Sequence, residues 1–505
     1  MNLASIIDEH EADDVALISR GRPTSYGALR DQVDRLRGGF AARGIGDGDR
    51  VAIVCSNGRQ FVVSYLAALG LGAVAVPLNP QSPALELQHQ IAVVDASLVV
   101  VEQSSWSSWA KVDRAAVPTV STVVIDEQLA ELDESSDGLV VIDDLLAHEP
   151  VPRVDVDPDH LAALLFTSGT AGAPRAAMLT HGNLVANVAS TLSAEGHLRS
   201  DDVVYGVLPL FHIYGLNVLL ATSLQVGATL VLVQRFDPLT AVESIRDRGV
   251  TVIPGAPAMW TAFAHFDELP DDAFASVRLA LSGASRLPVR VAETMRDRFG
   301  LEIREGYGLT EAAPTVTTSI GGPVRFGSVG RAVAGVEVRL VNANGEALVG
   351  DVGEIWVRGR NVFAGYYRDA EATDAVVTED GWLRTGDMAV CDEDGYLYLV
   401  DRAKDLVIVS GFNVFPAEVE DVLLSHPDVV EAGVVGVPHP HTGEAVKAFV
   451  VLRPGSTLHE EGLIDYCRDH LARYKCPSKI MFVDELPRNT TGKLLRRELG
   501  DPILS

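Results

Sequence analysis

The chain has 505 residues, which exceeds what one hydrophobic core usually supports, so its length predicts more than one domain. A hydrophobic content of 47% excludes a disordered chain. The formal net charge of −28 argues against a nucleic-acid-binding protein, because such proteins usually present a basic face, and any attraction for an anionic ligand must therefore be local.

The N-terminus and the cysteines predict a cytoplasmic protein without an integral membrane segment. Residues 8–14 are rich in Asp and Glu, unlike the basic start of a secretory signal peptide. The longest apolar stretch, residues 61–78, is interrupted by polar residues, glycines and a proline, so it predicts a buried helix followed by a buried strand. The four cysteines form no CxxC pair, which is typical of reduced thiols: Cys55, Cys391, Cys467 and Cys476.

The first half of the chain alternates short apolar runs with amphipathic segments. The runs predict buried strands at residues 51–54, 74–76, 98–101, 161–165, 229–232 and 252–253. Segments such as 29–43 and 241–248 predict helices that cover them. The alternation predicts an α/β fold of mostly parallel sheets with helices on their faces. Residues 104–137, rich in Ser, Asp and Glu, predict an exposed segment.

From about residue 324 the pattern changes to hairpins. Alternating strands are predicted at 336–341, 354–358 and 396–400, with a tight turn at 342–345, so a small β-rich subdomain is expected here. The last hundred residues predict a separate small α+β unit with strands at 429–437 and 446–452 and a helix at 463–471.

The loop at residues 166–175 has the sequence Phe-Thr-Ser-Gly-Thr-Ala-Gly-Ala-Pro-Arg and follows a predicted strand. Its small residues leave backbone N–H groups uncovered, so it can wrap phosphate oxygens, and Arg175 adds a positive charge. It is not a Walker loop, because the Gly-Lys-Ser/Thr ending is missing. Taken alone, the segment predicts a polar surface turn as well as it predicts a phosphate site.

Further motifs follow in order: Pro-Leu-Phe-His at 209–212, Gly-Tyr-Gly-Leu-Thr-Glu at 306–311, Trp-Leu-Arg-Thr-Gly-Asp at 382–387, Asp-Arg-Ala-Lys-Asp at 401–405 and Pro-Arg-Asn-Thr-Thr-Gly-Lys at 487–493. The set resembles the adenylate-forming enzyme superfamily, which includes acyl-CoA synthetases, 4-coumarate–CoA ligases, firefly luciferase and peptide-synthetase adenylation domains. The resemblance implies a large N-terminal domain at 1–401, a small mobile C-terminal domain at 402–505 and a hinge near Lys404.

The resemblance also implies a nucleotide site. Thr310 would touch the α-phosphate and Glu311 would bind Mg²⁺, which typically takes only one or two protein carboxylates. Asp387 and Arg402 would hold the ribose. The other residues at nucleotide-binding positions are Thr167, Ser168, Gly169, Thr170, Ala171, Gly172, Arg175, Gly283, Ala284, Ser285, Glu305, Gly306, Tyr307, Gly308 and Asn413.

Three residues of the phosphate loop depart from the usual Thr-Ser-Gly-Thr-Thr-Gly-x-Pro-Lys-Gly pattern. Ala171 replaces a threonine, Arg175 replaces the lysine and Ala176 replaces a glycine. Arg175 keeps the charge as a rigid fork instead of a flexible point. We expect slower or weaker pyrophosphate handling, with activity retained.

The remaining catalytic assignments follow from the same resemblance. Lys493 would bridge the substrate carboxylate and the α-phosphate from the mobile domain, which then rotates and brings in a thiol. His212 would lie beside the reacting carboxylate, although a buried structural histidine is the alternative. Ser410 and Gly411 match positions that line the CoA tunnel.

The acyl pocket is expected to be apolar and uncharged, because no Lys or Arg occurs in the segments that line it in the family. Its predicted residues are Tyr214, Ala256, Met259, Trp260 and Val316. A second carboxylate would be buried there unpaired, which costs several kcal/mol, whereas each buried methylene gains about 0.8 kcal/mol. A medium- or long-chain fatty acid is therefore the first expected substrate, and an aromatic acid such as a cinnamate the second.

The predicted activity is ATP-dependent formation of acyl-AMP, followed by thioester formation with CoA; the cofactors are ATP, Mg²⁺ and CoA. A carrier-protein acceptor, a homodimer, luciferase-type oxygenation and a non-catalytic nucleotide binder remain open. The non-catalytic alternative rests on the departures at Ala171, Arg175 and Ala176, whereas Glu311, Asp387, Arg402 and Lys493 argue against it. An amino-acid-activating domain is disfavoured, because such domains carry an Asp where this chain has Phe211-His212.

Overall fold

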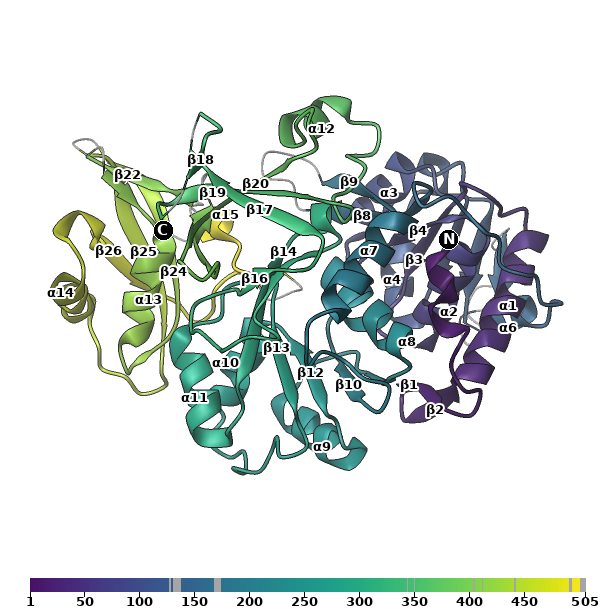
Figure 1. Ribbon diagram of the computed structural model, residues 1–505, viewed down its shortest axis with the longest axis horizontal. Helices are drawn as coiled ribbons and strands as arrows, with labels where there is room; N and C mark the ends of the chain where they lie inside the picture. Colours follow the sequence, from purple (N-terminus) through teal and green to yellow (C-terminus); the bar gives the residue numbers. More distant parts are fainter. Residues whose placement is uncertain are drawn as a thin grey trace.

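The structure is a computed structural model that describes residues 1–126, 129, 138–167, 174–342, 344–348, 350–402, 405–410, 412–439, 442–489 and 493–499. Two large sheets with helices on their faces form the first two thirds of the chain (Figure 1). A β-rich sheet follows, and the last strands form a sheet of their own. The α/β fold class predicted from the sequence is therefore confirmed.

A seven-stranded sheet lies in the N-terminal part, with the order β7-β6-β5-β3-β4-β8-β9. Its neighbours are parallel except β8 and β9, which form an antiparallel pair around the predicted phosphate loop. Valine-rich runs form its interior strands, because β-branched side chains fit a sheet that is buried on both faces. The strands are β3 (Arg50–Val54), β4 (Val74–Pro77), β5 (Leu98–Val101), β6 (Thr122–Ile125), β7 (Leu139–Val141), β8 (Leu161–Thr167) and β9 (Arg175–Thr180).

A nine-stranded sheet has the order β16-β15-β14-β13-β12-β10-β11-β1-β2 and is parallel at its centre. The antiparallel strands β2, β15 and β16 lie at its two ends. The strands are β1 (Val15–Ser19), β2 (Arg22–Ser25), β10 (Val203–Gly206), β11 (Thr229–Leu232), β12 (Val252–Gly255), β13 (Leu279–Ser282), β14 (Ile303–Gly308), β15 (Thr315–Thr318) and β16 (Arg331–Ala332).

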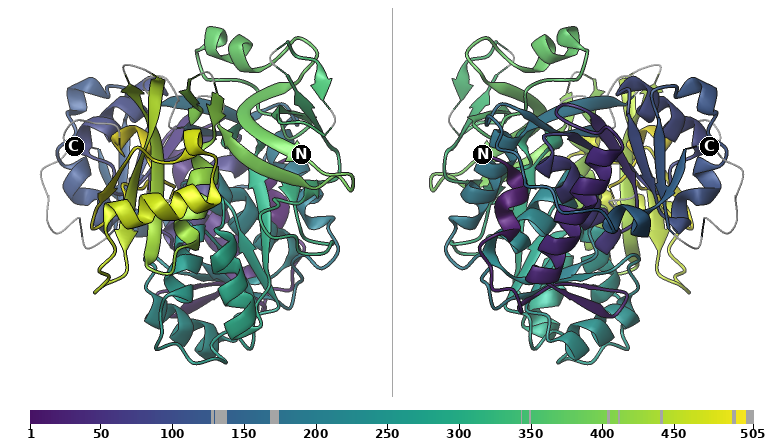
Figure 2. Two further views of the ribbon diagram at one scale, coloured as in Figure 1. Left: turned by 90° about the vertical axis from the view of Figure 1, so that its left-hand side faces the viewer. Right: turned by 90° about the vertical axis from the view of Figure 1, so that its right-hand side faces the viewer.

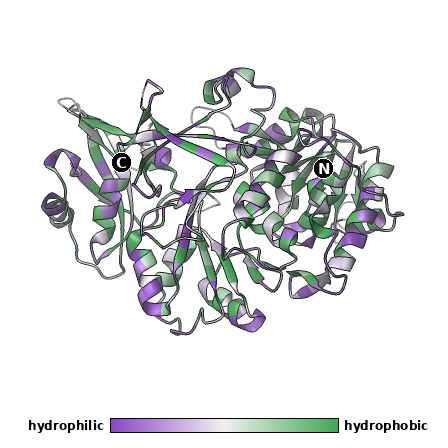
Figure 3. Ribbon diagram, in the orientation of Figure 1, coloured by the Kyte–Doolittle hydropathy of each residue, from purple (hydrophilic) through white to green (hydrophobic). Residues whose placement is uncertain are grey.

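Helices with clear capping signals cover the two sheets. Ser25 caps α1 through Ala28 N, and Thr180 and Asn183 form a capping box at the start of α7. Figure 3 shows mostly apolar strands and more polar outer helices. The helices are α1 (Tyr26–Ala42), α2 (Arg59–Gly70), α3 (Ala84–Val93), α4 (Trp106–Trp109), α6 (Ile142–Leu146), α7 (His181–Leu192), α8 (Thr222–Val226), α9 (Pro238–Arg248), α10 (Pro257–Ala264) and α11 (Val289–Phe299).

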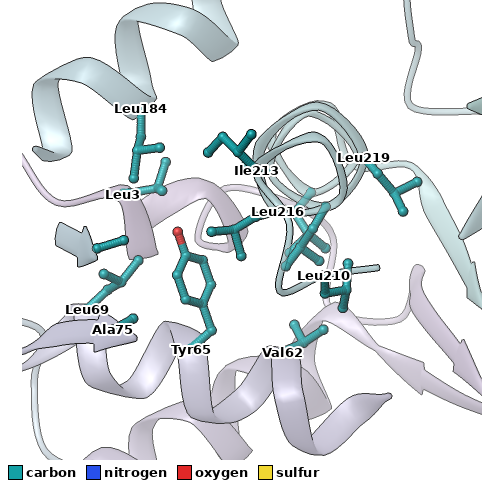
Figure 4. Packing of buried hydrophobic residues seen from close by; sticks show 14 of the residues in the cluster. Leu3, Val62, Tyr65, Leu69, Ala75, Leu184, Leu210, Ile213, Leu216 and Leu219 are labelled. Carbon is teal, nitrogen blue, oxygen red and sulfur yellow. The ribbon is translucent and has the colours of Figure 1, made fainter. Parts of the chain in front are cut away.

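The core between the two sheets is formed by α2, α7 and the π-helix η4 (Tyr214–Ala221). Tyr65 of α2 projects among Leu210, Leu216 and Leu3, with its hydroxyl directed toward Leu184 (Figure 4). All of these side chains are fully buried. The packing fixes η4 beside α7, and this position matters because both helices reach the functional cavity.

The β-rich part forms a five-stranded sheet with the order β18-β17-β19-β20-β21. Every pair in it is antiparallel, as the predicted hairpins require. Gly345 N donates to Asn342 O at 2.9 Å within the predicted turn, of which residue 343 lies outside the described residues. The elements are β17 (Val336–Val341), β18 (Ala347–Leu348), β19 (Gly353–Gly359), α12 (Ala370–Val376), β20 (Leu383–Cys391) and β21 (Leu397–Arg402).

The C-terminal unit has a sheet of its own, with two helices and a short α15 against it. It lies beside α11, as the two side views in Figure 2 also show. Arg286 pairs with Asp421 at 2.7 Å, and Arg290 donates to His426 O at 3.2 Å. The elements are β22 (Val407–Val409), β23 (Phe412–Val414), α13 (Pro416–Ser425), β24 (Val429–His439), β25 (Gly443–Leu452), α14 (Glu460–His470), β26 (Lys479–Phe482) and α15 (Arg496–Leu499).

The prediction that residues 104–137 form an exposed segment is right for only part of their described portion, because residues 104–121 mix exposed with buried positions and 122–125 form a buried strand. Trp109 is 3% exposed, and β6 is an interior strand between β5 and β7. The error arose because composition averaged over a long window concealed the short apolar run that builds β6. Residues 127–128 and 130–137 lie outside the described residues.

Among the helices that the structure describes, none is long and apolar enough to cross a membrane.

Candidate active site

A cavity of about 880 Å³ lies where the large sheets, the β-rich sheet and the C-terminal unit meet. Its lining includes residues of β8 and β9, η4, the ends of β13 and β14, β15 and β20, together with Arg488, Asn489, Lys493 and Arg497. The cavity brings together predicted residues that are up to 326 positions apart, because Thr167 and Lys493 both line it. The predicted residues in its wall are Thr167, Arg175, His212, Tyr214, Gly283, Ala284, Glu305, Gly306, Tyr307, Gly308, Thr310, Glu311, Asp387 and Lys493.

The predicted ribose ligand Asp387 lies on β20 and faces the predicted adenine platform. Tyr307 donates its hydroxyl proton to Asp387 Oδ2 at 2.6 Å. Thr385 accepts from Asp387 N at 3.1 Å, which holds the strand locally. Asp387 is also the register partner of Arg402 on β21, whose side chain lies outside the described part of the chain. A carboxylate and an aromatic ring therefore meet at this end of the cavity.

Tyr366 connects the predicted magnesium ligand Glu311 with Arg175, which replaces the lysine usual in the family. Tyr366 donates its hydroxyl proton to Glu311 Oε1 at 2.8 Å, and the Arg175 guanidinium lies 5.7 Å from the centre of the Tyr366 ring. Arg175 also pairs with Asp369, with Nε 2.9 Å from Oδ2. Burial and the nearby Glu311 carboxylate raise the pKa of Tyr366, so its hydroxyl stays a donor.

Glu311 fits a magnesium site of the kind predicted. Among the described residues there is no group of three or more His, Cys, Asp or Glu side chains that could hold a metal ion by themselves. Mg²⁺ usually keeps several waters and takes one or two carboxylates together with substrate phosphates, so a lone cavity-lining carboxylate suits it. Tyr366 donates to Oε1 of Glu311, so Oε2 takes no part in that hydrogen bond.

The segment after β13 is shaped around the ring of Tyr214. A Cβ atom on Gly283 would come within 3.0 Å of Tyr214 Cζ, so a larger residue there would displace the ring. Ala284 follows with φ +69°, a left-handed conformation that costs about 1 kcal/mol or more in a residue other than glycine. Tyr214 OH donates to Gly255 O at 3.4 Å. These contacts fix an aromatic wall beside the predicted adenine segment.

His212 and Lys493 approach each other from different parts of the chain. Burial, with a smaller contribution from the Lys493 ammonium, lowers the pKa of His212 to about 4. His212 Nδ1 accepts from Tyr214 N at 3.2 Å, so the proton of the neutral ring resides on Nε2. Lys493 N donates to Asn489 Oδ1 at 2.8 Å, which ties the backbone of the lysine to Asn489.

Glu305 is a buried carboxyl group in the cavity wall. Its side chain is 7% exposed, and burial raises its pKa to about 7. A backbone N–H from Leu287 at 3.4 Å and the Arg286 guanidinium oppose that shift only in part. Glu305 is therefore the cavity carboxyl whose charge changes near neutral pH.

Most of the predicted acyl pocket lies outside the cavity. Tyr214 lines it, whereas Ala256, Met259, Trp260 and Val316 are not in its wall. Trp260 is fully buried and donates Nε1–H to Leu281 O at 3.0 Å, and Met259 belongs to the same core cluster. The family resemblance suggested pocket residues here, but α10 turns Met259 and Trp260 into the core.

Other predicted residues lie elsewhere or outside the described part of the chain. Ser285 and Ser410 are described but do not line the cavity, and Ser410 has φ +51°. The backbone of Asn413 is described within β23, but its side chain is not. Ser168, Gly169, Thr170, Ala171, Gly172, Lys404 and Gly411 lie outside the described residues.

The structure adds cavity residues that the sequence reasoning missed. Tyr366 lines the cavity and donates to Glu311, and the Gly-Tyr-Tyr sequence before Arg368 was the available signal. Asp369 lies outside the lining but pairs with Arg175. Thr191 and His197 line a different part of the wall, and no motif pointed to them. The cations Arg384, Arg488 and Arg497 also line the cavity, so it has local positive charge in a strongly acidic protein.

Comparison with known proteins finds two family models that together match most of the chain. The model of the family described as AMP-binding enzyme matches residues 6–367, and that of the AMP-binding enzyme C-terminal domain matches residues 418–493. A long-chain-fatty-acid–CoA ligase of Bacillus subtilis is 32% identical over 98% of this chain and 94% of its own. A 4-coumarate–CoA ligase 3 of rice, Oryza sativa, is 33% identical over 95% and 87%.

A solved structure extends the likeness to three dimensions. ATP-bound MatB from Rhodopseudomonas palustris is 32% identical, with a TM-score of 0.90 over all of both chains. The apo form of MatB from the same organism gives a TM-score of 0.79, so the arrangement of this chain is closer to the ATP-bound form.

The chain belongs to the AMP-binding enzyme family. It is an AMP-forming acid–thiol ligase that uses ATP, Mg²⁺ and CoA.

Proposed function

We propose that the enzyme activates a carboxylic acid with no second charged group as acyl-AMP in this cavity and then transfers the acyl group to CoA. The observation that carries the proposal is the shared cavity. Lys493 from the C-terminal unit lines the same wall as Thr310, Glu311 and Asp387 from the rest of the chain. A non-catalytic nucleotide binder would not need a lysine delivered from a separate unit, so the arrangement favours catalysis.

In the proposed first step, a carboxylate oxygen attacks the α-phosphorus of ATP and pyrophosphate leaves. The barrier is the approach of two anions, which fixed positive charge and positioning lower. Lys493 would stabilise the charge that develops between carboxylate and α-phosphate, and Arg175 would hold the leaving phosphates. Mg²⁺ bound at Glu311 would neutralise phosphate charge. Neutral His212 beside Lys493 leaves the positive charge on the lysine.

In the proposed second step, CoA thiolate attacks the acyl carbonyl carbon and AMP leaves. Lys493 is no longer required, and rotation of the C-terminal unit about Lys404 would bring Ser410 and Gly411 to the cavity. The contacts Arg286–Asp421 and Arg290–His426 O hold the unit in the present arrangement, and the rotation would have to break them.

The proposed acid is a medium- or long-chain fatty acid. Phe211, Ile213, Val218 and Ile320 line the cavity beyond Tyr214 and supply apolar surface, which gains about 0.8 kcal/mol per buried methylene. Arg304 also lines the wall, but it donates to the carbonyls of Ser319 and Gly322, so it is committed to the protein. An aromatic acid is the second candidate, because the flat ring of Tyr214 would stack on it.

Pyrophosphate release with Mg-ATP and a panel of acids, with and without CoA, tests the proposal. The panel contains straight-chain acids from acetate to palmitate, cinnamate, malonate and succinate. We expect release with an acid that has no second charged group, a rising specificity constant from acetate to octanoate, and acyl-CoA as product. Preference for a dicarboxylate, or no thioester with any acid, would contradict it.

A further inference from the structure

Four buried polar atoms of cavity-lining residues lack a hydrogen-bond partner within the described part of the chain: Gln90 Oε1, Thr191 Oγ1, His197 Nε2 and Ser282 Oγ. Thr191 and His197 are six residues apart on one short segment. Thr191 Oγ1, in the last turn of α7, and His197 Nε2, five residues beyond that helix, are buried and have no partner among the residues that the structure describes. Both side chains belong to lining residues, and they are 3% and 4% exposed. Buried polar groups are nearly always satisfied in folded proteins, so two orphans on one segment of the wall point to a ligand.

The hydrogen-bonding role of His197 is fixed by its other ring nitrogen. Leu198 N donates to His197 Nδ1 at 2.7 Å, so Nδ1 must be the acceptor. Burial, and next the Arg278 guanidinium, lower the pKa of His197 to about 4, which keeps the ring neutral at neutral pH. In that tautomer the proton resides on Nε2, which is therefore an unsatisfied donor.

Thr191 is an unsatisfied hydroxyl in an unusual place. Threonine inside a helix commonly donates back to a carbonyl three or four residues earlier, and no such bond satisfies Oγ1 here. Its hydroxyl can therefore donate to a ligand. The contrast is Thr317 on β15, which lines the same cavity but donates to Val329 O at 2.6 Å.

The segment that carries both groups is held rigidly. Ala194 N donates to Thr191 O and His197 N donates to Ala194 O, so two successive turns link the pair. Arg278 donates to Gly196 O at 3.0 Å and to His197 O at 2.9 Å, and its guanidinium also pairs with buried Asp202. A preorganised donor pair binds a matching acceptor with little ordering cost.

The pair shares the cavity wall with apolar side chains and with the cation Arg304, which is bonded to the carbonyls of Ser319 and Gly322. Val218 of η4 and Ile320 after β15 line the same cavity, and η4 and β15 both contact α7. The neutral imidazole offers no charge to a second carboxylate. A neutral oxygen on an otherwise apolar group therefore satisfies this wall better than either a methyl group or an anion does.

We infer that Thr191 and His197 form an acceptor-recognition site for the far part of the acyl group, so that the preferred acid carries an uncharged oxygen such as a ketone or an ether. The inference rests on the proposed function and narrows its substrate class. A plain fatty acid leaves both donors unpaired and is activated more slowly. The recognition uses hydrogen bonds alone, with no covalent step.

Matched acids that differ by one oxygen test the inference. The aliphatic set compares octanoate with its 4-, 5-, 6- and 7-oxo derivatives, and the aromatic pair compares 4-ethylcinnamate with 4-methoxycinnamate. The readout is the ratio of specificity constants for pyrophosphate release, oxygen-bearing acid over plain acid. We expect at least one ratio of about ten or more in the wild-type enzyme, as sites built to bond a substrate oxygen discriminate strongly.

Three variants test whether the ratio of specificity constants depends on Thr191 and His197. Thr191→Val keeps the shape and removes the hydroxyl, and His197→Phe removes the Nε2 donor. Each should lower the best ratio about fivefold or more. Thr317→Val is the matched control, because its hydroxyl is already bonded within the protein, so the ratio should change less than about twofold. Circular dichroism verifies that each variant folds. If His197→Phe does not fold, the ratio measured for Thr191→Val decides the result.

The outcomes separate this inference from the proposed function. If the wild-type enzyme activates the plain acids but prefers no oxygen-bearing acid, the inference is overturned and the proposed function stands. A preference that survives both Thr191→Val and His197→Phe also overturns it. If no acid in either set supports pyrophosphate release and thioester formation, the proposed function fails, and the inference fails with it.

Discussion

The two ends of the cavity differ in the charged groups that the protein pairs and the neutral groups that it leaves unpaired. At the predicted nucleotide end, Asp387 accepts from Tyr307, Glu311 accepts from Tyr366, and Arg175 pairs with its own carboxylate partner. At the other end, Thr191 Oγ1 and His197 Nε2 have no partner among the described residues. A charged group left unpaired in a buried wall costs far more than a neutral one, so the charged end is paired by the protein before ligands bind.

This difference means that ligands act differently at the two ends. A nucleotide would have to exchange existing partners, so its binding depends on charges that are already positioned. An acyl group would instead supply the missing acceptors. Variants at the nucleotide end should therefore affect every acid equally, and variants at the acyl end should change the ranking of acids.

The largest expected effect comes from removing the lysine of the C-terminal unit. Lys493→Ala should lower acyl-adenylate formation by about 10²–10³-fold, because it removes a positive charge placed where charge develops. Conversion of supplied acyl-AMP and CoA to thioester should continue. Lys479→Ala, at an exposed position of β26 in the same unit, is the control and should adenylate normally. Wild-type adenylation by Lys493→Ala would exclude the lysine from the proposed site.

A smaller effect is expected at the ribose position. Asp387→Asn should raise the dissociation constant of ATP about 10- to 100-fold, because hydrogen bonds to a charged acceptor are worth about 1.5–3 kcal/mol. Isothermal titration calorimetry measures it. Tyr307→Phe keeps the carboxylate and loses only the 2.6 Å bond, so its effect should be smaller. The assignment is wrong if Asp387→Asn binds ATP like the wild type.

Glu305, a buried carboxyl group of the cavity wall, gives a test through pH. Its native pKa, about 7, is above the unfolded value, so between roughly pH 4.5 and 7 the native state holds a proton that the unfolded state has lost. Its contribution to stability is therefore full below pH 4.5 and is lost as pH rises through 7. Gln cannot titrate, so the free energy of unfolding of Glu305→Gln should not show this loss. The difference in free energy of unfolding, Glu305→Gln minus wild type, should therefore rise by about 2–3 kcal/mol between pH 5 and pH 8. A pH-independent difference in melting temperature would contradict the assignment.

The smallest effect is expected at Arg175. Arg175→Lys restores the residue usual in the family and keeps the charge, so activity should stay within about threefold of the wild type or rise. Arg175→Ala should lose the charge and lower the rate further. Complete loss in Arg175→Lys would show that the guanidinium, held by Asp369 at 2.9 Å, has acquired a role of its own.

The sequence predicted the fold closely because local patterns determine its elements. Runs such as residues 51–54 and 98–101 are short, apolar and β-branched, and they form β3 and β5 with almost the same bounds. Ala176, a departure from the family pattern, lies in the regular strand β9 and lacks the positive φ that would require glycine. This substitution therefore carries no conformational penalty.

The cavity was only partly predictable, because residue type does not show which way a side chain faces. Motif residues such as Thr310 and Asp387 line it, since the motifs themselves form its loops. Trp260 was expected in the pocket but packs into the core, because α10 presents that face to β13. His197 was missed, because its unsatisfied nitrogen depends on a bond to Leu198 N and on tertiary burial.

The account's central claim is that a carboxylate oxygen is joined to the α-phosphate of ATP in this cavity, and oxygen labelling tests it most directly. The preferred acid, labelled with ¹⁸O at both carboxylate positions, is incubated with Mg-ATP and CoA. The ¹⁸O content of each product is then measured by mass spectrometry. The account predicts AMP with one ¹⁸O atom, unlabelled pyrophosphate and acyl-CoA that retains the other. Unlabelled AMP, or label in inorganic phosphate with ADP as product, would contradict it.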